Sequence, residues 1–95
     1  MSNNPFYTES ESVSTLSLRN DSFVLLLHND EVNTFDHVID SLVDVCEHDP
    51  IQAEQCAFIV HYKGKCDVMH GSMVDLSARK TALCDRGLDA TIERN

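Results

Sequence analysis

The sequence is poor in glycine, in basic side chains and in long apolar runs. Only three of its 95 residues are glycine, so it has no glycine-rich loop of the kind that holds nucleotide phosphates. Its apolar runs, such as 23–27, are far shorter than the roughly 20 residues that a membrane-spanning helix requires. Seven basic against sixteen acidic residues give a net charge of −9. This charge disfavours nucleic acid and membrane surfaces as partners and favours a cationic one.

Paired ligand motifs are also missing. None of the four cysteines stands in a CxxC pair, and the five histidines supply no HxxxH pair, so neither a zinc site nor any other cofactor is expected. The cysteines lie within apolar patterns and are expected to be reduced core thiols: Cys46, Cys56, Cys66 and Cys84. The N-terminus lacks a basic region followed by an apolar segment, which predicts a cytoplasmic protein.

The length of the chain predicts one domain, and its composition divides it in two. Residues 1–20 are rich in serine, asparagine and threonine, with few apolar residues, which predicts a flexible N-terminal extension. Regular apolar patterns begin after this segment. Residues 21–95 are therefore expected to form the folded domain, which is long enough to bury a core.

The first half of this domain predicts a strand followed by two helices. The apolar run 23–27 indicates a strand buried on both faces, and therefore central in its sheet. Asn33 is suited to cap a helix that runs to about residue 47. Asp49, followed by proline, starts a second helix that Gly64 ends.

The second half predicts a strand, a helix and a strand. Residues 65–70 alternate between apolar and polar side chains, as in a strand with one solvated face. Ser72 is suited to cap a third helix that Gly87 closes, and residues 88–93 alternate in a last strand. The predicted fold is α+β, in the order β-α-α-β-α-β, with a three-stranded sheet covered by three helices.

A polar cluster follows the central strand. Asn29, Asp30 and Glu31 place an amide oxygen and two carboxylates on one rim, which suits a cationic hydrogen-bond donor. The alternative is that they only solvate a turn. His61 closes the apolar stripe of the second helix, and its neutral ring has one acceptor nitrogen, although a histidine at a helix end is commonly structural.

Two segments carry a resemblance to a known family. Leu-His-Asn-Asp-Glu-Val-Asn-Thr-Phe at 27–35 and Val-His-Tyr-Lys-Gly-Lys at 60–65 resemble the ClpS family of bacterial proteolytic adaptors. The resemblance extends from about residue 23 to residue 93, and the segment 88–93 is similar to the C-terminal strand of the family. It implies a ClpS-like fold for the domain.

The resemblance also implies a function. ClpS adaptors recognise proteins that begin with a destabilising residue, typically Leu, Phe, Tyr or Trp, and hand them to a ClpA-type AAA+ unfoldase coupled to the ClpP peptidase. The adaptor itself catalyses no reaction. A free N-terminus carries an ammonium group with three donors, and the side chain of the first residue projects from the same carbon. One site therefore has to bind both groups.

By the resemblance, Asn29, Glu31 and His61 match the positions that hydrogen-bond the α-amino group, and Asp30 is the neighbouring acidic residue of the motif. Arg79 matches a positive position on the surface that meets the unfoldase. The pocket for the first side chain would be lined by four apolar residues: Phe35, Val38, Ala57 and Leu88.

The sequence departs from the family pattern at several of these positions. Glu31 stands where aspartate is usual, and Phe35 and Ala57 stand where methionine is common. The smaller Ala57 predicts that β-branched first residues are excluded less strongly, because less side chain fills the mouth of the pocket. Val74 stands where an acidic residue is usual on the unfoldase surface.

Two other classes of function fit parts of the sequence. The same order of helices and strands occurs in the C-terminal domain of the ribosomal stalk protein, so an interaction domain with another partner is the main alternative. A hydrolase that uses Glu31 and His61 as acid and base is a second one, but no nucleophile, metal motif or anion hole accompanies them.

Overall fold

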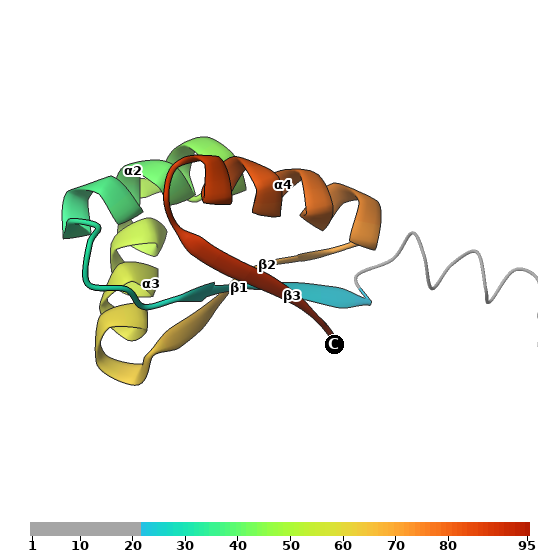
Figure 1. The fold of residues 1–95 in the computed structure, drawn as a ribbon, viewed down its shortest axis with the longest axis horizontal. Helices are drawn as coiled ribbons and strands as arrows, with labels where there is room; N and C mark the ends of the chain where they lie inside the picture. The colour runs from blue at the N-terminus through green and yellow to red at the C-terminus, as the bar shows by residue number, and fades with distance from the viewer. Residues whose placement is uncertain (1–21) are drawn as a thin grey trace, which may run out of the picture.

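The computed structural model describes residues 22–95, and the predicted extension over 1–20 lies outside them. The helices and strands follow in the order β1 (Phe23–His28), α2 (Phe35–Cys46), α3 (Pro50–Lys63), β2 (Lys65–Gly71), α4 (Met73–Asp85) and β3 (Asp89–Arg94). Helices α2 and α4 lie along one face of the sheet, and α3 lies at one end of it (Figure 1). The predicted α+β class and element order are confirmed.

Strand β1 is the centre of the sheet, as its unbroken apolar run predicts. It pairs antiparallel with β2 on one side and with β3 on the other, and Leu25 lies opposite both Met69 and Ile92. Alternate side chains of β1 face the helices, where Leu25 is fully buried in the core cluster. Val24 and Leu26, on the opposite face, are also buried, although the flanking strands place polar residues beside them.

Strand β2 contains one irregularity that the alternating pattern does not predict. Its register with β1 shifts between Leu25 and Leu26, which indicates a β-bulge. Cys66 and Val68 pack against the core as predicted, but Met69 does so too, because the extra residue returns the strand to the core-facing side. Val68 is buried in the core cluster, and the half-buried Cys66 and Met69 pack against it.

Four predicted helix boundaries agree with the structure. The Asp49 carboxylate accepts the Gln52 amide at 2.9 Å, and the Ser72 hydroxyl accepts the Asp75 amide at 3.2 Å. Gly64 ends α3 with φ of 93°, and Gly87 follows α4 with φ of 85°. Both glycines adopt the left-handed conformation that side chains disfavour, which explains why the helices end there.

The predicted cap of α2 is wrong by one residue. The hydroxyl of Thr34, and not the side chain of Asn33, accepts the amide of His37, at 3.1 Å. Asn33 is engaged elsewhere, because both its backbone amide and its side-chain amide donate to the carboxylate of Asp30. Because the Asn33 side chain is bound to Asp30, the neighbouring Thr34 caps the helix instead.

The expectation of four core thiols holds only in part. Cys46 and Cys56 are buried, Cys66 is half-buried and Cys84 is exposed. Cys84 follows the fully buried Leu83 on α4, and successive helical residues point about 100° apart, so an apolar neighbour in sequence does not make it a core residue. Within residues 22–95, no helix is long and apolar enough to cross a membrane.

Arg79 on α4 forms hydrogen bonds to the end of α2. Its guanidinium donates to the backbone oxygen of Val45 at 2.6 Å and also contacts Glu47 at 3.3 Å and Asp75 at 3.4 Å. The Val45 carbonyl belongs to the last turn of α2, where backbone oxygens lack helical partners. Arg79 therefore satisfies a group that the helix itself leaves unpaired.

We predict that Arg79→Ala lowers the free energy of unfolding by about 1 to 2 kcal/mol, because a charge-assisted bond to a helix end is lost. Urea unfolding followed by circular dichroism measures the change. Arg86→Ala is the matched control on α4, since its exposed ion pair with Asp44 is worth less than about 1 kcal/mol. Equal destabilisation by the two substitutions would contradict this role.

Candidate functional site

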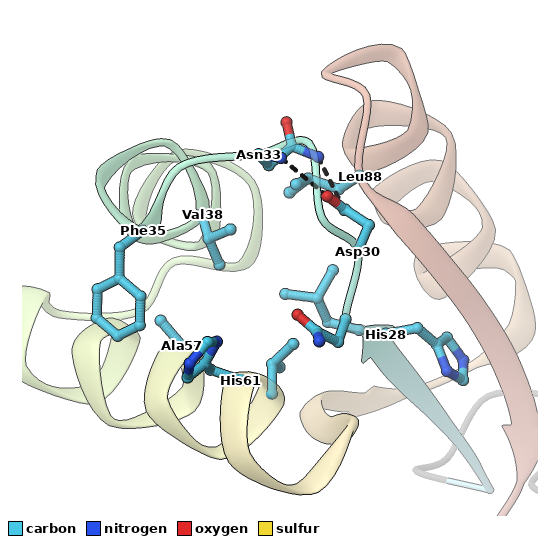
Figure 2. A pocket seen from close by; sticks show the side chains of 11 residues that line it. His28, Asp30, Asn33, Phe35, Val38, Ala57, His61 and Leu88 are labelled. Carbon is cyan, nitrogen blue, oxygen red and sulfur yellow. Dashed lines mark hydrogen bonds between the residues drawn. The ribbon is translucent and has the colours of Figure 1, made fainter.

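A cavity of about 60 Å³ opens beside the carboxyl end of β1 (Figure 2). Its lining comes from β1, the following loop, α2, α3 and the residue before β3: Leu27, His28, Asn29, Asp30, Asn33, Phe35, Val38, Ala57, Val60, His61 and Leu88. The space is several times the roughly 10 to 15 Å³ that one enclosed water requires, so it can take a group larger than a water molecule.

The rim of the cavity is built on the carboxylate of Asp30. One of its oxygens accepts the backbone amides of Val32 and Asn33, each at 2.9 Å, and the other accepts the side-chain amide of Asn33 at 2.8 Å. Partial burial acts to raise the pKa of Asp30, but these hydrogen bonds and the nearby His37 outweigh it, so its pKa is lowered from the usual value. The carboxylate is thus kept ionised at the rim.

Hydrogen bonds tie this rim to the rest of the domain on both sides. The amide of Asn29 donates to the Gly64 carbonyl, just after α3, at 2.9 Å. The side chain of Asn33 donates to the Gly87 carbonyl, just after α4, also at 2.9 Å. His37 adds a 2.8 Å bond to the Arg86 carbonyl. The loop after β1 is therefore anchored at the ends of two helices that are far away in sequence.

The walls of the cavity are apolar and come from several elements. Phe35 and Val38 extend from α2 toward Ala57 on α3, and Leu88 lies on the other side of the opening (Figure 2). The ring of Phe35 meets that of Phe58 edge to face, with 4.7 Å between centroids. This contact fixes the aromatic wall, because paired rings of this geometry attract each other beyond their buried area.

The structure brings most of the predicted site residues together. Asn29, Asp30 and His61 line the cavity, as do all four predicted pocket residues: Phe35, Val38, Ala57 and Leu88. Glu31 is exposed and does not belong to this lining. Arg79 lies in the contact between α4 and the end of α2 described above. Seven of the predicted residues therefore line one cavity, while Arg79, predicted for a separate unfoldase surface, lies elsewhere.

Four lining residues were not identified from the sequence: Leu27, His28, Asn33 and Val60. Leu27 and Val60 continue the apolar patterns of β1 and α3, and these patterns could have indicated that both side chains face the cavity. The ring of His28 points away from the cavity and bonds the Thr91 hydroxyl at 2.7 Å, which leaves mainly its backbone at the site (Figure 2). Asn33 gave no signal beyond its capping preference.

The chemistry of this site is that of binding a cation joined to an apolar group. The amide oxygen of Asn29, the carboxylate of Asp30 and the ring of His61, which has one acceptor nitrogen when neutral, are hydrogen-bond acceptors on residues that line the cavity. The remaining walls are apolar. An ammonium group carried next to a large hydrophobic side chain satisfies both parts at once, whereas a free inorganic cation would leave the apolar part empty.

The described residues offer little to an enzyme mechanism. No group of three or more His, Cys, Asp or Glu side chains in residues 22–95 is placed to hold a metal ion. Burial raises the pKa of the Cys46 thiol to about 11 and that of the Cys66 thiol to about 12, aided in each by the neighbouring Cys56. These two thiols are the opposite of activated nucleophiles, which require a lowered pKa.

A comparison with protein families matches residues 19–91 to the family described as the ATP-dependent Clp protease adaptor protein ClpS. This chain belongs to the ClpS family. The match covers most of the sequence and nearly all of the folded part, and it confirms the resemblance in the two motif segments. ClpS proteins are adaptors, which agrees with a site built for binding.

A comparison with solved structures supports the ClpS fold. The structure of Agrobacterium tumefaciens ClpS2 bound to L-phenylalaninamide matches with a TM-score of 0.71 and 19% sequence identity, over 77% of this chain and 95% of that one. A search of curated proteins by sequence finds no significant match. The fold is therefore retained at low sequence identity, and the family assignment separates this chain from the stalk-like alternative with the same element order.

We predict that Asp30→Asn makes folding stability less dependent on pH. Since folding lowers the pKa of Asp30 below its usual 3.8, its stabilisation is fully present above that value and is lost as the pH falls through the lower pKa of the folded state. Wild-type protein should therefore lose more stability than the variant between about pH 5 and pH 2.5. Urea unfolding across this range tests it, with the exposed Asp40→Asn as control. Parallel curves for wild type and Asp30→Asn would contradict the prediction.

Proposed function

We propose that this domain binds the free α-amino group and the large hydrophobic side chain of a protein's first residue: Leu, Phe, Tyr or Trp. The observation that carries the proposal is a cavity lined both by apolar side chains and by residues with hydrogen-bond acceptors, including an ionised carboxylate. By this proposal the domain recognises N-degron proteins and does not change them chemically.

The proposed contacts to the ammonium group come from Asn29 and His61. Both side chains are exposed at the mouth, so a ligand can reach them without rearrangement of the core. Asp30 already accepts three donors, which leaves about one of its four lone-pair positions for the ligand along with its full charge. Glu31, exposed on the same loop, adds a second negative charge outside the cavity.

The first side chain would enter the pocket formed by Phe35, Val38, Ala57 and Leu88. Burying one large apolar side chain contributes roughly 1.5 to 3 kcal/mol, and each charge-assisted hydrogen bond contributes a similar amount. Association entropy and desolvation offset part of this gain. We expect micromolar affinity, which corresponds to a binding free energy of about −8 kcal/mol.

The similarity to ClpS2 supports the choice of ligand. The compound in that structure, L-phenylalaninamide, has a free α-amino group beside a phenylalanine side chain. These are the two features that the cavity and its rim would recognise here. Together with membership of the ClpS family, this likeness favours N-terminal residues over other cationic ligands.

Delivery of the bound protein to a ClpA-type AAA+ unfoldase, and through it to ClpP, is the proposed next step. We propose residues 21–95 as the adaptor domain and the cytoplasm as its place of action. Arg79 was matched to the unfoldase surface, but its guanidinium bonds Val45, Glu47 and Asp75 within the domain. Only about 25% of this side chain is exposed, so an unfoldase contact would have to use that part.

We predict that a labelled peptide beginning with Phe binds with micromolar affinity, and that its N-acetylated and Met-first versions bind at least tenfold more weakly. Acetylation removes the charge and two of the three ammonium donors, whereas a first methionine retains them and tests the fit of its narrower side chain in the pocket. Fluorescence anisotropy measures all three. Equal binding of the free and acetylated Phe peptides would overturn the proposed function.

Substitution of His61 tests whether the peptide binds at this cavity. His61→Ala should weaken the Phe-first peptide about tenfold, the loss expected for one charge-assisted hydrogen bond. His70→Ala, an exposed histidine on β2, is the matched control and should leave the affinity unchanged. If both variants bind like wild type, His61 does not contact the ligand.

We predict that Ala57 permits β-branched first residues. It lines the cavity and is only 3% exposed, so a larger side chain there would have to occupy the pocket. Wild type should bind an Ile-first peptide within a hundredfold of the Leu-first one, and Ala57→Met should widen this gap at least tenfold, by steric exclusion. Ile-first binding weaker than a hundredth of Leu-first binding to wild type would contradict the prediction.

A further inference from the structure

The outer side of α3 presents aromatic side chains that the core does not use. Phe58 is 44% exposed and Tyr62 is 75% exposed. They are four residues apart and therefore lie on the same face of the helix, with their rings stacked at a centroid distance of 6.2 Å. Two large neighbouring apolar side chains left open to solvent are typical of a binding surface when they adjoin a pocket.

Ring contacts join these residues to the cavity at both ends. Phe35 meets Phe58 edge to face at 4.7 Å, and His61 meets Tyr62 edge to face at 5.0 Å. Phe35 and His61 both line the cavity. The four residues, Phe35 from α2 and the other three from α3, thus form one continuous row of rings, here called the aromatic row, whose two ends line the cavity.

The geometry of an extended peptide determines which residue can reach this row. Successive side chains of an extended chain point to opposite sides, and each residue advances the chain by about 3.3 Å. If the first side chain points into the cavity, the second points away from the protein. The third returns to the protein side about 6.6 Å further along the chain, so a surface that adjoins the mouth of the cavity lies within its reach.

We propose that the aromatic row is a second subsite, which binds an apolar or aromatic side chain at the third residue of the substrate. The inference rests on the proposed function, because the first residue has to occupy the cavity for this register to hold. Since these two rings stack on each other, the exposed edges and outer faces of Phe58 and Tyr62 offer the contact. Phe35, held by Phe58, forms both a wall of the cavity and the start of the subsite.

Three labelled peptides, each followed by the same polar sequence, test this register: Phe-Ser-Trp, Phe-Trp-Ser, which exchanges the second and third residues, and Phe-Ser-Ser, which lacks tryptophan. Fluorescence anisotropy should show the first binding about three- to tenfold tighter than the third, the gain typical of an aromatic contact. The second should bind within twofold of the third. The N-acetylated form of the first should lose its binding.

Substitutions locate the effect on the surface. Tyr62→Ser should reduce the advantage of Phe-Ser-Trp over Phe-Ser-Ser to less than twofold. Val74→Ser is the control, because Val74 is 81% exposed on α4 and its removal takes away a similar exposed apolar group. In this control the full advantage should persist.

The outcomes separate the subsite from the function on which it rests. If Phe-first peptides bind but the third residue has no effect, or if tryptophan acts from the second position, the subsite is overturned and the proposed function stands. An advantage that persists in Tyr62→Ser also overturns it. If free and acetylated peptides bind equally or not at all, the proposed function fails and the subsite fails with it.

Discussion

The site depends on the carboxylate of Asp30. By accepting three hydrogen bonds from Val32 and Asn33, it closes the loop that redirects the chain from the central strand into α2. This turn leads directly into α2, from which Phe35 and Val38 contribute to the wall of the cavity. The same interaction lowers the pKa of Asp30, so the group that shapes the rim also keeps a negative charge there.

Much of the fold could be predicted from the sequence, because its signals are local. The run 23–27 is apolar throughout and forms the central strand, and Asp49 and Ser72 cap the helices that follow them. Asn33 could not be assigned in this way. Its side chain bonds the Gly87 carbonyl, 54 residues away, and no local pattern shows that such a partner exists.

Only the site residues that follow from the apolar periodicity or from the family motif could be predicted. Residues with inward positions on regular elements, such as Val38 and Ala57, are found at the cavity as expected. Glu31 was matched through a motif, yet the turn directs the loop so that it is exposed outside the lining. Helix α3 shows a second limit, since Phe58 and Tyr62 make its outer side apolar too, and periodicity alone cannot distinguish two apolar faces.

The exposure of the rim also bears on what an adaptor requires. Asn29 and His61 remain open to solvent, so hydrogen bonds that they make to a ligand compete with water and gain less than buried ones would. Micromolar affinity with ordinary association rates of about 10⁵ to 10⁷ M⁻¹s⁻¹ implies residence times of roughly 0.1 to 10 seconds. A buried, fully desolvated site would hold its ligand far longer. A solvent-exposed rim over a small apolar cavity is therefore suited to reversible binding.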